Sequence, residues 1–145
     1  MWLCKKFEEL STYELFLIYK VRTEIFVVEQ QCAYPEVDDK DLISLHLFYL
    51  ENDQILAYAR IIPEKNTVHF GRVLVVQSAR QEGWGRKLVE QILNTIKVYF
   101  PDKKVHIQAQ EYLQNFYQSF GFKAISAVYL EDGIPHLDME LVKQA

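Results

Sequence analysis

The sequence has few cysteines, scattered histidines and no surplus of positive charge, and each shortage excludes a class of protein. Its two cysteines form no CxxC pair and suit a reducing compartment, which excludes a disulfide-stabilised secreted module. The histidines, at positions 46, 69, 106 and 136, show no metal-ligand spacing, so we expect no metal site. The formal net charge of −4 argues against a nucleic-acid-binding protein, which normally presents a basic surface.

Long apolar runs are also missing. No apolar stretch approaches the length of a membrane span, and the first residues, MWLCKKFEEL, carry no apolar core before their charges, so they do not form a signal peptide. With 145 residues, 50 % of them hydrophobic and 25 % charged, the chain is long enough for one domain with a real core. We therefore expect a single domain over residues 1–145, located in the cytoplasm, with neither a membrane nor a nucleic acid as partner.

Hydrophobic spacing predicts an α/β chain in which strands and helices alternate. Helices are predicted after a capping box formed by Ser11 and Glu14, from Gly85 onward, and around Tyr117, where Gly121 provides a left-handed end. The acidic segment 32–41 is predicted as a loop, in which the charges serve solubility or attract a cationic substrate. The predicted strands are residues 2–7, 45–50, 55–62, 67–76, 105–110, 123–129 and 135–141.

The joint between strand 67–76 and the following helix has the composition of an anion site. Gly83 and Gly85 stand at the helix start, where backbone N–H groups are unpaired and the helix dipole is positive. Arg80 and Arg86 add positive side chains. A P-loop would need Gly-Lys-Ser/Thr here, and a dinucleotide fingerprint would need a small residue where Leu88 stands, so both patterns fail. The loop is a candidate diphosphate cradle; the alternative is that its glycines serve packing only.

Gly71 interrupts the bulky residues of strand 67–76. A glycine inside a strand indicates a β-bulge, which would free N–H groups to face a ligand, or else local packing. Regular alternation along the strand places His69 on one face with Gly71, Val73 and Val75, and Arg72 on the other face.

Several of these motifs together resemble one enzyme family. The pattern Arg80-x-x-Gly83-x-Gly85 after a strand resembles the acetyl-CoA signature of the GCN5-related N-acetyltransferases (GNAT), and the order of elements resembles that fold along nearly the whole chain. The pair Asn115 and Tyr117 ahead of Gly121 is similar to the family's cofactor-binding helix. Four segments resemble the ElaA-like subfamily: RTEIFVVEQ (22–30), YPEVDDKD (34–41), LQNFYQSFGF (113–122) and EDGIPH (131–136).

The resemblance implies an α+β fold, with a mixed central sheet, a splayed central strand and flanking helices. It implies acetyl-CoA as cofactor, CoA as product, and a primary amine as acceptor. Main-chain groups of Val73 and Val75 would bind pantetheine, and an N–H near Val73 or Leu74 would stabilise the thioester oxyanion. Asn115 would hold the pantetheine arm, and Tyr117 would protonate the leaving thiolate. The diphosphate would bind at Arg80, Gln81, Glu82, Gly83, Trp84, Gly85 and Arg86.

The general base is left open at this stage. Glu29 is the first choice, because the resemblance places its motif beside the cleft, and His69 is the second catalytic candidate. Neither cysteine lies in a nucleophile motif, so we expect direct attack by the amine in a ternary complex. The other candidates for the base are Glu24, Arg72, His106 and Gln108.

The acceptor and the partners follow from weaker features. The carboxylates Glu36, Asp38, Asp39 and Asp41, with Glu24 and Glu29, would make the entrance negative, so we expect a small cationic amine or a peptide or protein amine. A homodimer is compatible with the sequence. Two alternatives to an enzyme are a sensor that binds acetyl-CoA or CoA without turnover and a plain interaction domain, although the latter leaves the loop at 80–86 unexplained.

Overall fold

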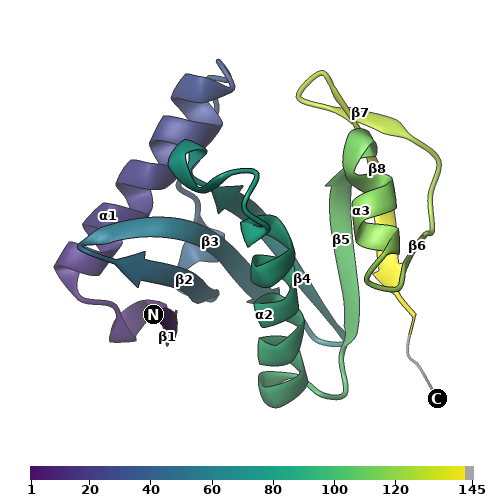
Figure 1. Ribbon diagram of the computed structural model, residues 1–145. Helices are drawn as coiled ribbons and strands as arrows, with labels where there is room; N and C mark the ends of the chain where they lie inside the picture. Colours follow the sequence, from purple (N-terminus) through teal and green to yellow (C-terminus); the bar gives the residue numbers. More distant parts are fainter. Residues whose placement is uncertain (143–145) are drawn as a thin grey trace.

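The computed structural model describes residues 1–142, in which a mixed sheet runs from one end of the molecule to the other (Figure 1). The strands follow the order β1-β2-β3-β4-β5-β8-β6, and β7 pairs with β8. Only the β4–β5 pair is parallel among these described strands. The strands are β1 Trp2–Lys6, β2 Leu45–Glu51, β3 Gln54–Pro63, β4 Thr67–Val75, β5 Lys104–Gln110, β6 Phe122–Ala124, β7 Tyr129–Glu131 and β8 Ile134–Leu141.

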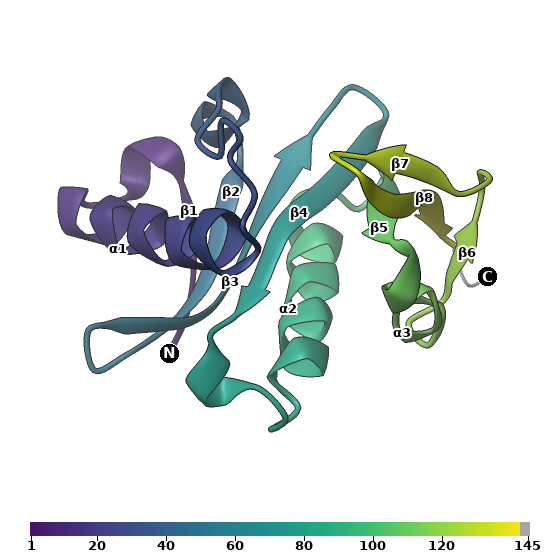
Figure 2. The same ribbon diagram turned by 90° about the horizontal axis from the view of Figure 1, so that it is seen from above.

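Helices cover both faces of this sheet (Figure 2). The three α-helices are α1 Thr12–Arg22, α2 Trp84–Tyr99 and α3 Gln114–Gln118. The chain after α1 continues as a π-helix, η2 Thr23–Glu29. This form is rare in proteins, and where it occurs it is often part of a functional site. Short 3₁₀ turns are η1 Phe7–Glu9, η3 Asp39–Leu42, η4 Gln77–Ala79 and η5 Glu111–Leu113. Mixed sheet, splayed strand and flanking helices confirm the fold class expected from the sequence.

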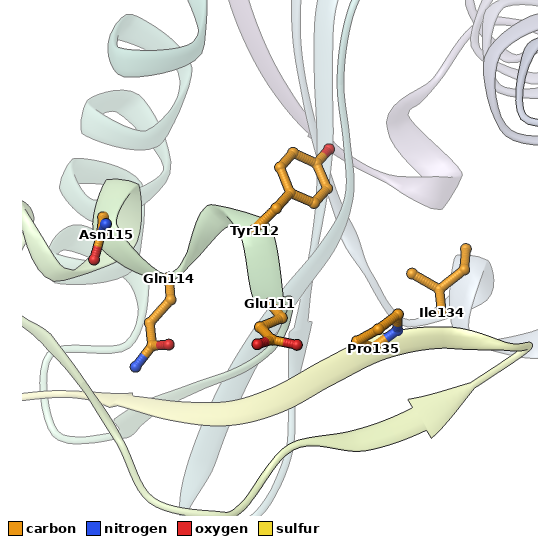
Figure 3. Close-up of a pocket in the computed structure, with 6 residues that line it drawn as sticks. All are labelled: Glu111, Tyr112, Gln114, Asn115, Ile134 and Pro135. Carbon is orange, nitrogen blue, oxygen red and sulfur yellow. The ribbon is translucent and has the colours of Figure 1, made fainter.

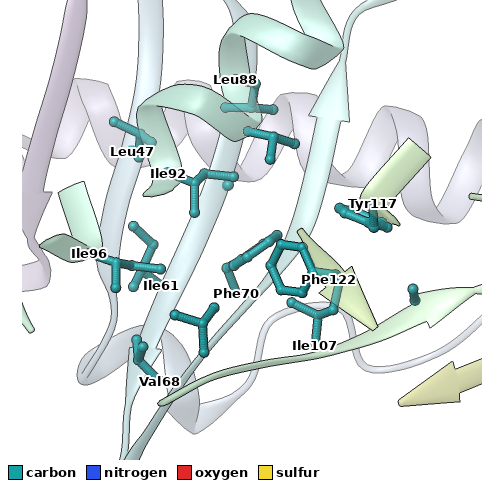
Figure 4. Close-up of a cluster of buried hydrophobic side chains, with 14 of the residues drawn as sticks. Leu47, Ile61, Val68, Phe70, Leu88, Ile92, Ile96, Ile107, Tyr117 and Phe122 are labelled. Atoms are coloured by element: carbon teal, nitrogen blue, oxygen red, sulfur yellow. The ribbon is translucent and has the colours of Figure 1, made fainter. Parts of the chain in front are cut away.

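Two hydrophobic cores lie on opposite faces of the sheet. On one face, the apolar side of α2 packs against the central strands, as Figure 4 shows for Leu88, Ile92 and Ile96 above Ile61 and Phe70. The other face is covered by α1, which packs against the side chains of β2, β3 and β4 that point away from α2. The buried residues of that second core are Ile18, Val21, Ile25, Phe48, Ile55, Tyr58 and Leu74.

The capping box at the start of α1 is confirmed. The Ser11 hydroxyl accepts the Glu14 N–H at 3.0 Å, and the Ser11 N–H donates to Glu14 Oε1 at 2.8 Å. These two bonds satisfy N–H groups that a helix start otherwise leaves unpaired.

The predicted strand 123–129 is wrong, because the chain leaves the sheet between β6 and β7. Ile125 N–H donates to Asp138 O at 2.9 Å, and then the Ser126 hydroxyl accepts the N–H of Asp138 at 2.8 Å. A side chain thus takes the place of a main-chain acceptor, and the ladder stops. The two short strands β6 and β7 therefore pair with different parts of β8.

A bulge in β4 is confirmed, one residue beyond the glycine that suggested it. Tyr58 pairs with Leu74 and Arg60 pairs with Gly71, so Arg72 and Val73 together lie opposite one residue of β3. Arg72 has a left-handed φ of 50°, whereas Gly71 does not need its conformational freedom.

The bulge reverses the alternation of side chains, so the predicted sharing of a face by His69, Val73 and Val75 is wrong. Before the bulge, Phe70 points toward α2; after it, Val73 and Val75 point to that same side and Leu74 points toward α1. One extra residue shifts the period-2 pattern by one position.

Candidate functional site

Strands β4 and β5 separate after a short common stretch, and this separation opens a cleft. Their parallel pairing ends with His69 opposite His106, although β4 continues to Val75 and β5 to Gln110. The edge of β4 from residue 70 to 75 thus has no partner on β5, and its main-chain groups can pair with another extended chain. The cleft has a volume of about 580 Å³ and is also lined by the segment after η2, Tyr117 and the β7–β8 hairpin.

The loop at the end of β4 presents bare backbone at the start of α2. Gly83 is the N-cap residue with φ 78°, and no side chain caps the helix. A Cβ on Gly83 would meet nothing within 4 Å, and one on Gly85 would meet only the ring of Phe116, at 3.9 Å. Unpaired N–H groups, the helix dipole and open space together suit an anion, so the structure brings the predicted cradle into one place.

The basic side chains of this loop are held by neighbours. Arg80 donates through Nε to the Val75 carbonyl at 2.9 Å and through Nη2 to Glu29 Oε2 at 3.0 Å. Arg86 reaches α3, where it donates to the Ser119 hydroxyl at 2.8 Å and lies 4.5 Å from the Phe120 ring centre. Both guanidinium groups are therefore fixed close to the first turn of α2.

Glu29 lies at this loop and not among the residues that line the cleft. The hydrogen bond from Arg80 lowers the pKa of the Glu29 carboxyl, which weakens it as a proton acceptor. This placement favours a role in holding Arg80 over the role of general base that the motif suggested. Glu24 is exposed, and it too is absent from the cleft lining.

Tyr117 lines the cleft and is only 6 % exposed. Its ring packs between Phe70 and Phe122, with centroids 6.2 and 5.8 Å away. Burial raises the pKa of Tyr117 to about 12, since the phenolate is poorly solvated there. The phenol therefore keeps its proton at neutral pH and can donate a hydrogen bond to an anion in the cleft.

Asn115 does not join Tyr117 in the cleft. Residues two apart on a helix point about 200° away from each other, and Asn115 is exposed on the far side of α3. It borders a separate groove of about 420 Å³ between the η5–α3 turn and the start of β8, shown in Figure 3. Gln108, one of the candidates for the base, and Gln110 line the main cleft instead. The alternation of β5 could have singled out Gln110 as well, since it turns both away from the α2 core.

His69 lies where the cleft begins, at the end of the β4–β5 pairing. Its Nε2 is 3.3 Å from the Thr67 hydroxyl and 3.5 Å from Glu64 Oε1, and its ring centre is 5.8 Å from that of His106. His69 lines the cleft, whereas His106 does not and lies 3.7 Å from Glu140. Of the histidine candidates for the base, His69 is the one with access to a bound amine.

The acidic loop forms a largely buried network with arginines, so Glu36, Asp38 and Asp41 do not supply the free negative charge expected of them. Arg22 is fully buried; it donates through Nε to both oxygens of Glu36, at 3.1 and 3.0 Å, and forms a two-pronged bond to Asp41, at 2.8 and 3.1 Å. Despite the opposing effect of burial, the hydrogen bonds from Arg22 lower the pKa of Asp41. These carboxylates are neutralised where they stand.

The same network extends to the sheet. Arg60 binds both oxygens of Asp38, at 2.7 and 3.1 Å, and Arg72 Nε lies 2.7 Å from Glu36 Oε1. His46 bridges the Tyr58 hydroxyl and the Asp41 carbonyl, at 2.7 and 2.9 Å, and burial lowers its pKa. The charge pattern around Arg22 in the sequence gave no sign of this network, because its three arginines come from α1, β3 and β4.

Two further searches concern metals and membranes. Residues 1–142 contain no cluster of three or more His, Cys, Asp or Glu that could hold a metal ion. In this part of the chain there is also no helix with the length and apolar character to cross a membrane.

Comparison with known proteins gives a consistent result. A family model described as acetyltransferase (GNAT) domain matches residues 18–143. A UPF0039 protein of Schizosaccharomyces pombe is 51 % identical over 140 residues, covering 94 % of this chain and 93 % of that protein. Protein ElaA of Escherichia coli is 43 % identical over 136 residues, covering 90 % and 89 %. The crystal structure of an acyl-CoA N-acyltransferase from Pseudomonas aeruginosa matches with a TM-score of 0.95 at 39 % identity, covering 98 % of this chain and 99 % of that one.

Proposed function

Since the chain belongs to the GNAT acetyltransferase family, we propose that it transfers the acetyl group of acetyl-CoA directly to a primary amine of a small molecule or peptide. The observation that carries this proposal is the alignment of three features along β4: the bulge, the strand edge without a β5 partner, and the bare helix start at its end. An extended thioester with a diphosphate at its far end fits this line. Pairing with Val73 and Val75 would bring the acyl group toward Tyr117.

The cleft residues account for both proton movements of the reaction. An alkyl ammonium has a pKa of roughly 10.4, so at pH 7 removing its proton corresponds to about 4–5 kcal/mol. His69 lines the cleft and has Glu64 beside it, so it can take that proton directly or through a water molecule, and Glu64 stabilises the imidazolium that forms. The amine then attacks, and an N–H at the bulge near Val73 or Leu74 stabilises the oxyanion. As the intermediate collapses, the buried Tyr117 phenol donates a proton to the departing thiolate. The second proton of the attacking nitrogen passes to the Tyr117 oxygen, directly or through water, so the phenol is restored and the products are the amide and the CoA thiol.

The main chain of residues 81–86 would hold the diphosphate, with Arg80 and Arg86 beside it. Gln110 supports the pantetheine arm better than Asn115 does, because it lines the cleft. The cytoplasm remains the proposed location, since Cys4 and Cys32 are both free and acetyl-CoA is an intracellular metabolite in the general case.

Acetyl-CoA-dependent release of free thiol with a panel of amines tests the proposal, together with Tyr117→Phe. This change keeps the buried ring and removes the hydroxyl, so folding and CoA binding are retained while kcat falls by roughly ten- to a thousandfold. Binding of acetyl-CoA without thiol release for any amine would replace the enzyme with a CoA-binding sensor. Unchanged kcat in Tyr117→Phe would assign thiolate protonation to solvent.

A further inference from the structure

Three carboxylates of the acidic segment, Glu36, Asp38 and Asp41, are held by arginines. The Glu36 and Asp41 side chains are 4 % and 1 % exposed and are bound by arginines, and Asp38 is held by Arg60 through both oxygens. A cationic amine would have to displace a guanidinium to reach any of them, at the cost of leaving that guanidinium unpaired. Asp38 lines the cleft and its side chain is 34 % exposed, but both of its oxygens already accept hydrogen bonds from Arg60.

Arg72 is the most exposed arginine of the network. Both Arg72 and Arg60 line the cleft, but the Arg72 side chain is 21 % exposed, whereas that of Arg60 is 5 % exposed and that of Arg22 is completely buried. The guanidinium is oriented by Glu36: Nε lies 2.7 Å from Oε1, and Nη2 donates to the Glu36 carbonyl at 3.0 Å. Its centre lies 5.2 Å from the Tyr34 ring centre. Its Nη1 has no hydrogen-bond partner anywhere in residues 1–142.

The backbone at Arg72 adds a second observation. Its φ of 50° belongs to the left-handed region, where a glycine or asparagine would fit with less strain. A long side chain at such a position points to a use for the side chain itself. Since Val73, the next residue, lies at the bulge that would face the thioester, Arg72 enters the cleft within one residue of the reacting carbonyl.

The cleft is also lined by acidic side chains outside this network. Glu64 lies on the β3–β4 turn, and Glu131 and Asp132 lie on the β7–β8 hairpin; all three line the cleft. Figure 2 shows the segment that follows α1 and the β7–β8 hairpin on opposite sides of β4. An ammonium group is favoured near these acids, and an anion is favoured near the free edge of Arg72.

We propose that Arg72 anchors a carboxylate of the acceptor, so that the acceptors are amines that also carry a carboxylate a few bonds away, such as free amino acids. This inference rests on the proposed acetyl transfer and narrows its acceptor class. The network is neutral overall, with three arginines and three carboxylates, and its one free guanidinium edge offers hydrogen bonds to a single small anion, which a carboxylate is at neutral pH. Anchored there, the carboxylate sets the amine at the thioester and Arg72 acts as a specificity-determining residue.

The test compares each of several L-amino acids with its carboxamide in the thiol-release assay. For the wild type, we expect kcat/KM to be about 10- to 100-fold higher for the acid, the range for a hydrogen bond to a charged group. Arg72→Gly fits the left-handed φ, keeps the bulge and removes the guanidinium, so the ratio should fall to about 1–3 while the carboxamide values change little. Lys65→Gln, on the exposed turn next to Glu64, is the matched control and keeps the wild-type ratio.

Equal kcat/KM values for acids and amides in the wild type would overturn the inference, as would an Arg72→Gly variant that loses both equally. Should Arg72→Gly unfold, Arg72→Lys keeps the positive charge but not the planar guanidinium. Its ratio of kcat/KM for the acid to that for the carboxamide is then expected between the wild-type ratio and the ratio of about 1–3. Absence of thiol release with every amine would instead refute the proposed function. In that case, ligand-observed NMR with N-acetyl amino acids and their amides, in the presence of CoA, still decides the site: acid-selective binding lost in the Arg72 variant supports it, and equal binding refutes it.

Discussion

Replacing Gly85 by alanine should make the protein more stable and its CoA binding weaker. Gly85 is the second residue of α2, it has no positive φ, and its added Cβ would meet only Phe116 at an ordinary contact distance of 3.9 Å. Gly83 is less suitable for this test, because its φ of 78° would strain any branched side chain and would mix folding with binding.

The change should raise the stability of the free protein and lower its affinity for CoA, and each effect has its own expected size. Alanine in place of glycine stabilises a helix by about 0.5–1 kcal/mol, which raises Tm by about 1–4 °C for a chain of this size. The same methyl group stands in the open space between the first turn of α2 and α3, where a diphosphate would approach the N–H groups. Loss of one hydrogen bond to a charged group costs about 1.5–3 kcal/mol, so the Kd for CoA should rise about 10- to 150-fold.

Thermal unfolding with and without CoA measures both quantities in one experiment. The free variant should melt above the wild type, and the CoA-induced rise in Tm should shrink, since ligand stabilisation depends on the ratio of concentration to Kd. Asn94→Ala is the matched control: it is exposed on α2, gains helix propensity and lies away from the loop, so it should keep the full CoA effect. A Gly85→Ala variant that binds CoA like the wild type would refute the assignment of the diphosphate to this helix start.

Two further predictions concern the base and the charge network. His69→Gln should lower kcat by roughly 10²–10⁴-fold in the thiol-release assay and leave the Kd for CoA unchanged, whereas full activity would exclude His69 as base. Asp41→Asn should destabilise the fold by about 3–5 kcal/mol in urea titrations, because it leaves part of the buried Arg22 charge unpaired; a loss below about 1 kcal/mol would show that the network is not a structural element. Burial lowers the pKa of His46, and the arginine partners lower the pKa values of Asp38 and Asp41, so in acid the unfolded state binds more protons than the folded state. The free energy of unfolding should therefore be at its full value above about pH 6.5, fall first as His46 becomes protonated, and fall again below about pH 4. A urea midpoint that stays constant from pH 7 to pH 4 would contradict this.

Most of the fold could be predicted from the sequence, because its signals are local. The capping box at Ser11, the amphipathic spacing of α2 and the glycines before it each depend on neighbours in the chain. The bulge could also be predicted, from Gly71. Its consequence for side-chain direction could not, since the extra residue is Arg72, and only the register with β3 shows where the alternation shifts.

The parts of the candidate site that depend on local sequence could be predicted, whereas the side-chain contacts between distant segments could not. The loop at 80–86 presents free backbone and Tyr117 lies in the cleft, as expected, while their parts in binding and catalysis stay predictions. Asn115 was expected in the cleft too, although its distance of two residues from Tyr117 turns it away. The acids at 36–41 read as free charges, because sequence spacing does not reveal that Arg22, Arg60 and Arg72, from three different elements, converge on them. Long-range pairing of this kind depends on the folded arrangement.

Because the parallel pairing of β4 with β5 is short, the β1–β4 part of the sheet and the part formed by β5, β6, β7 and β8 are joined near one end of these two strands only. The ladder between β4 and β5 covers Thr67, Val68 and His69. Apolar packing adds to it, since α2 contacts both parts and Phe70 packs against Tyr117 and Phe122. An extended molecule that pairs with the free edge of β4 would act as an inserted strand and reduce the motion of the two parts of the sheet relative to each other. The amides between Phe70 and Val75 should then be the fast-exchanging stretch of the central sheet in the free protein, and the stretch whose protection rises most when the gap is filled.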